Sequence, residues 1–517
     1  MWCTLKGITR LMKGAESQLR KAAWVLMLSL ACALAVSACA VACTSFIAGK
    51  NATTDGSVIS AHNEDLSADT CERVEVFPGK TFKEGEIEYL GSGEALPWVA
   101  AKYKVIQFNS GYDVNDYNGD NPNFVNQFGV SSWDNAMTPR KELLEIESRA
   151  KNLVDSKELK RIPLERAKSA REAVQILGYL VDTFGFIRNG MCYGIADPKE
   201  GWIVEVTQGK HWVAQRVPDD MVVMRSNCYR IGDVDLSDTQ NFLASKNLID
   251  YAIERGWYDP AIGAKFNFAE TYGSPDSLKS PGNTQREWGG LTFLKPSLAL
   301  DPNGPTPYVA ERGIVNGVVP DDKITVENAM EFLRIHYEGT SLDGSAGYAK
   351  GSPHWTTNRV ICVNTTNCSS VVQHRSWLPT EIGSVIWRAD NTPCCSVFVP
   401  WYLGITTTPV EFRTGTSTPT DDSAWWLYTR IANTVDAHYA KFIGNVRPVF
   451  KQIEADLLTV QPFVENAAYG IYMISPQKCA AFLTNYSGGT ALNALGVARK
   501  VLNDLVRESA RGSWRNP

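Results

Sequence analysis

The chain has 517 residues, of which 44% are hydrophobic and 21% are charged, and its net charge is −5. This composition is typical of a soluble globular protein and excludes an intrinsically disordered chain. The length exceeds the ~100–200 residues usual for one domain, so we expect one large domain with an appendage, or two domains.

The first 42 residues differ in kind from the rest. Five basic residues precede an uncharged run over residues 22–42: Lys6, Arg10, Lys13, Arg20 and Lys21. This pattern predicts an export signal, and the small residues Ala40-Val41-Ala42 favour cleavage directly before Cys43. Cleavage there removes those five basic residues and Glu16, so the net charge falls from −5 to −9. A mature chain this acidic is not expected to bind nucleic acid. We expect it in the periplasm, in the cell envelope or in the medium.

Two other fates of this segment stay open. Val36-Ser37-Ala38-Cys39 resembles a lipobox, in which Cys39 would be acylated and become the first residue. The uncharged run at 22–42 is also long enough to stay as an uncleaved anchor, since ~20 apolar residues span a bilayer. Either fate would attach the protein to a membrane and leave Cys43 internal.

The first predicted elements of the mature chain are strands. Residues 44–49 and 57–62 flank a turn at Asp55-Gly56 and predict a β-hairpin. Residues 201–206, 211–216 and 221–224, separated by Gly209 and Pro218, predict a three-stranded meander.

Helices alternate with these strands. Ser169-Ala-Arg-Glu172 predicts a capping box before an amphipathic helix that reaches Phe184, and Thr325 opens a second helix. Residues 423–458 and 491–511 also look helical. We therefore expect an α+β fold with a domain at 43–405, a Thr/Pro-rich linker at 406–422 and a helical C-terminal region at 423–517.

The chemistry predicted at Cys43 depends on its becoming the first residue. The pKa values of an α-amine, about 7.7–8.0, and of a thiol, about 8.5, are close, so the amine can take the thiol proton. The hairpin places Cys43 and Asp65 at the same end of the sheet. Asn63 and Asp65, two residues apart on one strand, share a face there.

The same residues carry a family resemblance. Cys43-Thr-Ser-Phe-Ile-Ala-Gly-Lys-Asn-Ala-Thr-Thr-Asp-Gly-Ser57, followed by His62-Asn-Glu-Asp65, resembles the start of mature N-terminal-nucleophile (Ntn) dipeptidases, a family that includes dipeptidase A and the secernins. The likeness continues in order through residues 126–130, 202–205, 225–227, 336–340 and 372–379. The chain is more distantly similar to penicillin V acylases and bile salt hydrolases. The resemblance implies a four-layer αββα sandwich and hydrolysis of a peptide or amide bond.

The resemblance also implies site residues. Cys43 would be nucleophile and base, Asp65 the partner of its α-amine, Asn227 an oxyanion donor and Arg286 an active-site arginine. Three more residues are implied at the substrate, with Asn135 as a second oxyanion donor: His62, Asn63 and Asn135. Two positions depart from the family pattern. His62 stands where the acylases have arginine, which makes a fixed charge titratable, and Gln127 replaces a common glutamate.

Cysteine and histidine spacing predicts neither a metal nor a cofactor. Nine cysteines follow residue 42, and an odd count in an exported protein suggests up to four disulfides with Cys43 left free. The six histidines show no His-Glu-x-x-His spacing. Cys362, Cys368, Cys394 and Cys395 are not spaced like structural zinc ligands, so disulfides are favoured for them.

These observations predict an exported cysteine dipeptidase whose partner is a dipeptide. The alternatives are an N-acyl amide hydrolase of the acylase type and a non-catalytic envelope protein that binds ligands with the same fold. A homo-oligomer is compatible with the sequence.

Overall fold

The computed structural model describes residues 42–67, 69–109 and 123–512. The chain divides into two compact units, residues 1–42 and 43–517, and the second contains all the elements below. The predicted export signal, the lipobox and the anchor alternative fall on residues 1–41, outside the described residues. In the part of the chain that is described, no helix is long and apolar enough to cross a membrane.

The strands of the described residues form two large antiparallel sheets. The first sheet has seven strands in the order β16 (Gly317–Val318), β12 (Val222–Arg225), β1 (Thr44–Ala48), β2 (Val58–Asp65), β17 (Thr366–His374), β18 (Ser384–Asp390) and β19 (Val399–Tyr402). The second has eight, in the order β13 (Phe242–Ala244), β11 (His211–Val217), β10 (Gly201–Gly209), β9 (Phe186–Ala196), β8 (Ser131–Ala136), β7 (Asn123–Asn126), β6 (Val105–Asn109) and β3 (Arg73–Phe77). Two short ribbons pair β4 (Lys80–Thr81) with β5 (Ala101–Lys102) and β14 (Ala310–Glu311) with β15 (Ile314–Val315).

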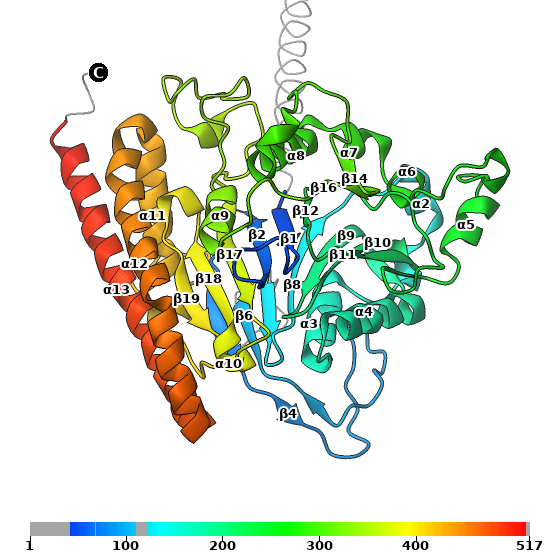
Figure 1. The fold of residues 1–517 in the computed structure, drawn as a ribbon, viewed down its shortest axis with the longest axis horizontal. Coiled ribbons are helices and arrows are strands. Elements are labelled where there is room, and N and C mark those ends of the chain that lie inside the picture. The colour runs from blue at the N-terminus through cyan, green and yellow to red at the C-terminus, as the bar shows by residue number, and fades with distance from the viewer. Residues whose placement is uncertain (1–41, 68, 110–122, 513–517) are drawn as a thin grey trace, which may run out of the picture. The chain divides into compact units, whose positions relative to one another are not determined.

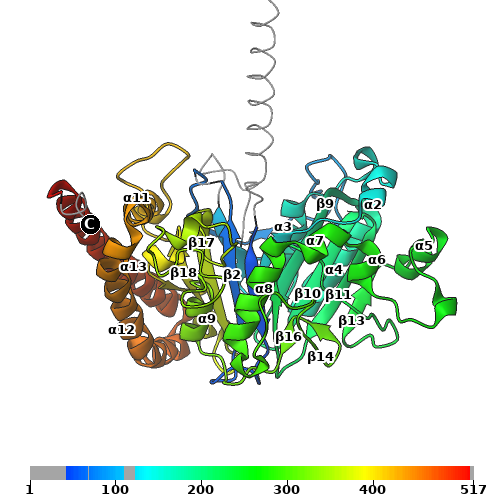
Figure 2. The ribbon, with the colours of Figure 1, turned by 90° about the horizontal axis from the view of Figure 1, so that it is seen from above.

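Helices cover the outer face of each sheet. The α-helices are α2 (Lys141–Ile146), α3 (Ser156–Arg166), α4 (Ala170–Phe184), α5 (Leu248–Glu254), α6 (Phe268–Tyr272), α7 (Pro275–Lys279), α8 (Pro281–Leu294), α9 (Val326–Phe332), α10 (Thr380–Gly383), α11 (Ala424–Ala437), α12 (Tyr439–Ile474) and α13 (Pro476–Ala510). Helices α3 and α4 pack on the second sheet, whereas α8, α9 and α11–α13 pack on the first (Figures 1 and 2). Strands β1 and β2 face β9 and β10. The predicted αββα sandwich with C-terminal helices is confirmed.

Alternation along β1 shows how the layers are filled. Phe46 belongs to the apolar cluster between the first sheet and its helices, whereas Ile47 belongs to the cluster between the sheets. Because strand side chains alternate with a period of two, Cys43 and Ser45 share the face of Ile47. The nucleophile predicted from the sequence therefore faces the interior between the two sheets.

The predicted N-terminal hairpin is confirmed. Strands β1 and β2 pair antiparallel, with Thr44 opposite Asn63. The Asp55 carboxylate closes the turn by accepting hydrogen bonds from the Ser57 backbone N–H (3.0 Å) and hydroxyl (2.6 Å). Strand β2 runs on to Asp65, so the polar run that begins at His62 lies within the strand.

The predicted meander is wrong in its third strand. Strands β10 and β11 pair in the second sheet, but β12 pairs with β1 in the first. Pro218 has no N–H to continue the ladder of β11, and its carbonyl accepts from Met221 N–H (3.1 Å) in a turn. This turn passes so close to Gly49 that a Cβ there would lie 2.4 Å from the Pro218 oxygen. The crossing brings β12 beside β1.

The predicted helix starts are largely correct. Thr325 and Asn328 form a reciprocal capping box at α9. Ser169 caps α4 by accepting from Glu172 N–H (3.2 Å), but the Glu172 carboxylate reaches Lys168 N–H (2.7 Å) instead of Ser169. The second half of that predicted capping box is therefore absent.

The C-terminal helices are longer than predicted. Residues 406–422 connect β19 to α11. Helices α12 and α13 then run through residues 459–490, which lie between the two segments predicted to be helical, with a break at Ser475. Helix α12 contains Pro448 and Pro462. Apolar side chains of these helices, such as Phe450 and Leu495, belong to the same cluster as Trp401 of β19.

The predicted disulfides are absent. All nine cysteines of the described residues are buried free thiols. The sulfurs of Cys394 and Cys395 lie 3.5 Å apart, whereas a disulfide requires about 2.05 Å.

One buried histidine links the two sheets. His374 of β17 is fully buried, and its Nε2 lies 2.8 Å from the hydroxyl of Ser131 in β8. Its Nδ1 lies 3.3 Å from the Ser384 hydroxyl. Burial lowers the pKa of His374 to about 3, so the ring is neutral in the folded protein at neutral pH.

This burial predicts a pH-dependent stability. Below pH ~6.5 the unfolded chain binds a proton at His374 that the folded chain does not bind. The free energy of unfolding therefore decreases by about 1.4 kcal/mol for each unit by which the pH is lowered. We expect acidification from pH 6.5 to 5 to destabilise the wild type by about 2 kcal/mol more than His374→Gln. Denaturant unfolding at both pH values measures this. Equal losses in the two proteins would contradict it, and above pH ~7.5 their slopes should coincide.

Candidate active site

Strand register places Cys43 between two polar residues. Ser45 pairs with His62 on one side and with Arg225 on the other, so Cys43 is opposite Glu64 in β2 and opposite Asn227 just beyond β12. The Cys43 thiol donates to Glu64 Oε1 at 3.7 Å, and Cys43 is only 2% exposed.

The surroundings keep this thiol protonated. Burial raises the pKa of Cys43 well above its ordinary value, and the carboxylates of Glu64 and Asp65 raise it further. A hydrogen bond with the backbone N–H of Asp65 lowers this pKa but does not offset the rise. Since the thiolate is the nucleophile, Cys43 needs a neighbouring base to react.

Arg286 connects Cys43 to Asn227. Its Nη1 donates to the Cys43 carbonyl (2.6 Å), to Asn227 Oδ1 (2.9 Å) and to Thr44 Oγ1 (3.1 Å). Its Nη2 donates to Asn283 Oδ1 (2.9 Å), which fixes the guanidinium on α8. Burial and the nearby Arg359 lower the pKa of Arg286 to about 10, so it stays charged at neutral pH.

The contacts of Asn227 fix which way its amide points. A guanidinium can only donate, so the oxygen of Asn227 faces Arg286 and the NH₂ group faces away. One N–H donates to the Ala136 carbonyl (2.9 Å). The other has no acceptor within the described residues, and Asn227 is half-buried, so this N–H can donate to an oxygen of a bound molecule.

Asp65 forms a buried charge pair with Arg359. Its carboxylate accepts from Arg359 Nη2 and from the Thr366 hydroxyl (2.6 Å). Burial raises the pKa of Asp65, while Arg359, Thr366 and Arg286 lower it. Direct contact with the Arg359 guanidinium keeps the carboxylate ionised at neutral pH.

His62 is a neutral residue in this structure. Its Nε2 lies 3.0 Å from the Asp134 carbonyl, which can only accept, so this nitrogen carries the hydrogen. Burial and the charge of Lys160 lower the pKa of His62 to about 3, and its ring stacks on Trp133. The replacement of arginine by histidine therefore gives a fixed neutral contact rather than one that titrates near neutral pH.

The amides of Asn63 and Asn135 contact protein groups. Asn63 donates to the carbonyls of Leu333 (2.9 Å) and Ile361 (3.1 Å) on the helical side of β2. Asn135 donates to the Ser226 carbonyl (3.0 Å) and the Ser45 hydroxyl (3.1 Å), which ties the second sheet to the first. Both side chains hold together the segments that carry the site.

The structure thus joins four of the predicted residues in one network: Cys43, Asp65, Asn227 and Arg286. It adds two residues that sequence reasoning missed, Glu64 and Arg359. Glu64 was visible as the cross-strand partner of Cys43 in the predicted hairpin. Arg359 carried no such signal, because 294 residues separate it from Asp65.

A cation could contact the same region. Ligand atoms of Cys43, His62 and Glu64 all lie within 4.8 Å of one another. In the structure the thiol and the ring nitrogen instead contact the Glu64 carboxylate, at 3.7 Å and 3.6 Å. Direct contacts with the Glu64 carboxylate therefore account for the positions of the thiol and the ring, and no ion is needed to explain them.

Known sequences resemble this chain over most of its length. The sequence model of Peptidase family C69 matches residues 42–452. A "Probable dipeptidase" of Salmonella dublin is 30% identical over 372 residues, which cover 71% of this chain and 82% of that protein. A "Probable dipeptidase" of Latilactobacillus sakei is 24% identical over 456 residues, covering 87% and 93%. A "Probable dipeptidase B" of Streptococcus pyogenes serotype M1 is 27% identical over 449 residues, covering 84% and 86%.

Among solved structures, two variants of the conjugated bile acid hydrolase of Clostridium perfringens are similar to this chain. One is 9% identical with a TM-score of 0.31 and covers 67% of this chain and 89% of its own. The other is 10% identical with a TM-score of 0.30 and covers 74% and 98%.

Proposed function

The chain belongs to peptidase family C69, which makes it a peptide hydrolase, and we propose that it is an exported dipeptidase with Cys43 as its N-terminal nucleophile. The observation that carries this proposal is the environment of the thiol. Cys43 is buried and protonated beside Glu64 and Asp65, and His62 turns a protonated nitrogen towards the neighbouring carbonyl. Removal of residues 1–42 would supply the missing base as the α-amine of Cys43 itself.

In the proposed reaction, the α-amine of Cys43 takes the thiol proton and the sulfur attacks the carbonyl carbon of the peptide bond. The free N–H of Asn227 donates to the developing oxyanion. The α-ammonium then gives its proton to the leaving amine, and a thioester to Cys43 remains. Water, deprotonated by the same amine, hydrolyses the thioester and releases the second amino acid.

Arg286 and Asp65 would position these groups. Arg286 holds the carbonyl of Cys43 and the amide oxygen of Asn227, so nucleophile and oxyanion donor stay in fixed relation. The Asp65 carboxylate, at the same end of the hairpin, would attract the α-ammonium formed during the reaction. Dipeptides are the proposed substrates because several family members are named as probable dipeptidases.

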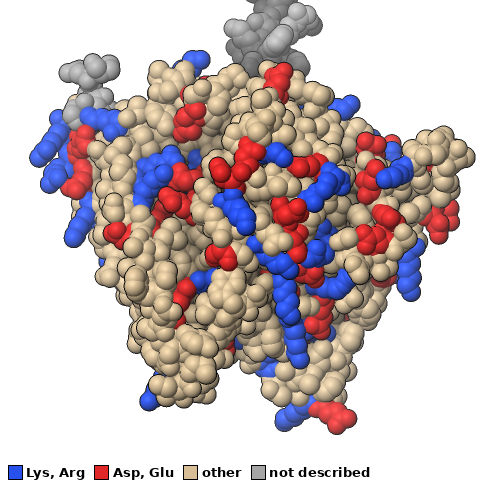
Figure 3. Space-filling model, in the orientation of Figure 1, with Lys and Arg blue, Asp and Glu red and all other residues tan. Residues whose placement is uncertain are grey.

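Two measurements test this proposal: the identity of the first residue of the mature protein, and the range of substrates that it hydrolyses. We expect intact mass of the exported protein to begin at Cys43 without a lipid, and we expect turnover of dipeptides. Basic, acidic and uncharged side chains are interspersed on the face in Figure 3, so the panel should contain basic, acidic and apolar dipeptides. Turnover of acyl-amino-acid conjugates alone would reject the dipeptidase proposal.

A processing-blocked variant provides the matched control. Ala40→Leu with Ala42→Leu removes the small residues that signal peptidase requires and leaves the active-site residues unchanged. We expect the uncleaved chain to accumulate with less than about 1% of wild-type activity, because an amide nitrogen cannot accept the thiol proton. Full activity with Cys43 still internal would contradict the mechanism and would require another base.

A further inference from the structure

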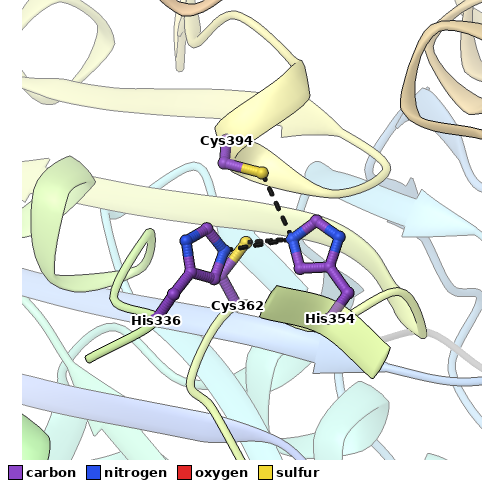
Figure 4. A group of neighbouring side chains, drawn as sticks. All are labelled: His336, His354, Cys362 and Cys394. Atoms are coloured by element: carbon purple, nitrogen blue, oxygen red, sulfur yellow. Dashed lines mark hydrogen bonds between the residues drawn. The ribbon is translucent and has the colours of Figure 1, made fainter. Parts of the chain in front are cut away.

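Two histidine and two cysteine side chains meet in the interior, in a group separate from the one that contains Cys43. His336, His354, Cys362 and Cys394 are all buried, and their ligand atoms all lie within 4.8 Å of one another. Figure 4 shows the two imidazole rings and the two sulfurs converging from separate segments of the chain. His354 lies in the short 3₁₀ turn η4 (Pro353–Trp355) and Cys394 in another, η5 (Pro393–Cys395).

The distances within this cluster are close to those of a tetrahedral site. His354 Nε2 lies 3.0 Å from His336 Nε2, 3.3 Å from Cys394 Sγ and 3.8 Å from Cys362 Sγ. With zinc–nitrogen distances near 2.0–2.1 Å and zinc–sulfur distances near 2.3 Å, ligand atoms of a tetrahedron lie roughly 3.3–3.8 Å apart. These three distances differ from that range by at most a few tenths of an ångström.

The outer nitrogen of each ring contacts a carboxylate. His336 Nδ1 lies 3.0 Å from Glu338 Oε1, and His354 Nδ1 lies 2.7 Å from Asp436 Oδ1. An ionised carboxylate can only accept, so both Nδ1 atoms carry hydrogen. Metal-bound histidines in proteins almost always donate their other N–H to such a group, which fixes the ring and its tautomer.

This assignment leaves an electrostatic conflict inside the cluster. Two neutral rings protonated at Nδ1 present two Nε2 lone pairs to each other at 3.0 Å. Lone pairs at that distance repel, so a positive charge between them is required. A proton could bridge the two nitrogens, but a cation would also contact the sulfurs of Cys362 and Cys394, which point to the same place.

We propose that His336, His354, Cys362 and Cys394 bind one structural Zn²⁺ ion. Two thiolates and two imidazoles in a tetrahedral arrangement select zinc among the common divalent metals. Binding releases the two thiol protons, so the ion and its ligands carry no net charge. All four side chains are buried, which matches a closed structural site rather than one with a position open to substrate.

The ion would also fix the position of an active-site residue, because Arg359 lies in the segment between two of its ligands, His354 and Cys362. Arg359, which pairs with Asp65, lies three residues before Cys362. The Arg359 carbonyl accepts from the hydroxyl of Tyr337, the residue after His336 (2.8 Å). Zinc would therefore hold the segment that supplies Arg359, and through Asp436 it would fasten this segment to the end of α11.

The proposed zinc site differs from the sequence-based expectation of disulfides and no metal. The ligands lie 18 residues apart from His336 to His354, 8 from His354 to Cys362 and 40 from His354 to Cys394. Such intervals match no short zinc motif. Cys368 and Cys395, which the sequence grouped with two of these ligands, lie outside the cluster.

Metal analysis of the whole exported protein tests the proposal. We expect about one zinc per chain by inductively coupled plasma mass spectrometry after purification without chelators. Exchange for Co²⁺ should give the thiolate charge-transfer band and the visible bands of a tetrahedral site. Cys394→Ser and His354→Gln should lose the metal and the spectrum. Cys395→Ser, a change at the adjacent buried cysteine, should keep both.

The wild-type protein decides the matter even if the variants do not fold. Removing zinc with a strong chelator should lower Tm, and added Zn²⁺ should restore it. Wild type purified with no bound metal and unable to take up Zn²⁺ or Co²⁺ would overturn the proposal. So would a mass two hydrogens lower with a Cys362–Cys394 disulfide. Neither readout depends on peptide hydrolysis, so failure of the zinc proposal can be distinguished from failure of the proposed dipeptidase activity.

Discussion

Replacing Cys43 by alanine is expected to lower kcat/KM for dipeptides by at least about 1,000-fold, the largest loss that any single change in this chain should cause. The sulfur is the group proposed to bond to the substrate carbon, and the neighbouring side chains cannot replace it. Glu64 is held by the thiol and His62 donates to a carbonyl. Steady-state rates on purified mature protein measure the loss.

The control for this change is another buried cysteine. Cys479 lies in α13 and is 1% exposed, so Cys479→Ala tests the loss of a buried sulfur far from the site. We expect it to keep wild-type kcat/KM. Cys43→Ser should fall between the two, because a hydroxyl is a weaker nucleophile at neutral pH than a thiol. Cys43→Ala with wild-type rates would show that another residue attacks the substrate.

Asp65→Asn is expected to damage both stability and activity. The change leaves the largely buried Arg359 guanidinium without its partner and removes the anion that lies near Arg286 as well. Breaking a buried pair of this kind costs about 3 kcal/mol of unfolding free energy. We expect kcat/KM to fall about 100-fold, because the α-amine loses the carboxylate that would stabilise its charged form. Denaturant unfolding and steady-state kinetics give the two values.

Two further variants separate charge from packing. Thr366→Val removes one hydrogen bond to Asp65 but keeps the carboxylate, so a cost of about 1 kcal/mol and a small kinetic effect are expected. Asp69→Asn removes an exposed carboxylate and should leave both quantities near wild type. If Asp65→Asn proved as mild as Asp69→Asn, the carboxylate would have no role at the nucleophile.

The parts of the fold that the sequence predicted correctly depend on local chemistry. The Asp55-Gly56 turn and the alternating residues around it define the β1–β2 hairpin, and its register alone puts Glu64 opposite Cys43. Thr325 caps α9 through a residue three positions away. In each case the interacting residues are close in sequence, so their spacing is sufficient to predict the turn or the helix cap.

The parts that sequence reasoning missed depend on partners far apart in the chain. Strand β12 has the same apolar character as β10 and β11, and nothing in its residues says that it pairs with β1. The contact of Arg359 with Asp65 and the cluster around His354 join distant segments through tertiary packing. Residue type alone did not distinguish these side chains from ordinary surface or core residues.

The C-terminal helices share one hydrophobic core with the first sheet, which limits where the protein can be truncated or joined to another chain. Helix α13 packs on β19, the last strand of the first sheet, and the match to the family ends at residue 452, inside α12. A truncation after residue 405 would expose Trp401 and an unpaired strand edge together, a combination that favours aggregation between molecules. These helices therefore cannot be replaced independently of the rest of the domain. We expect any functional chimera to keep them together with the sheet that they cover.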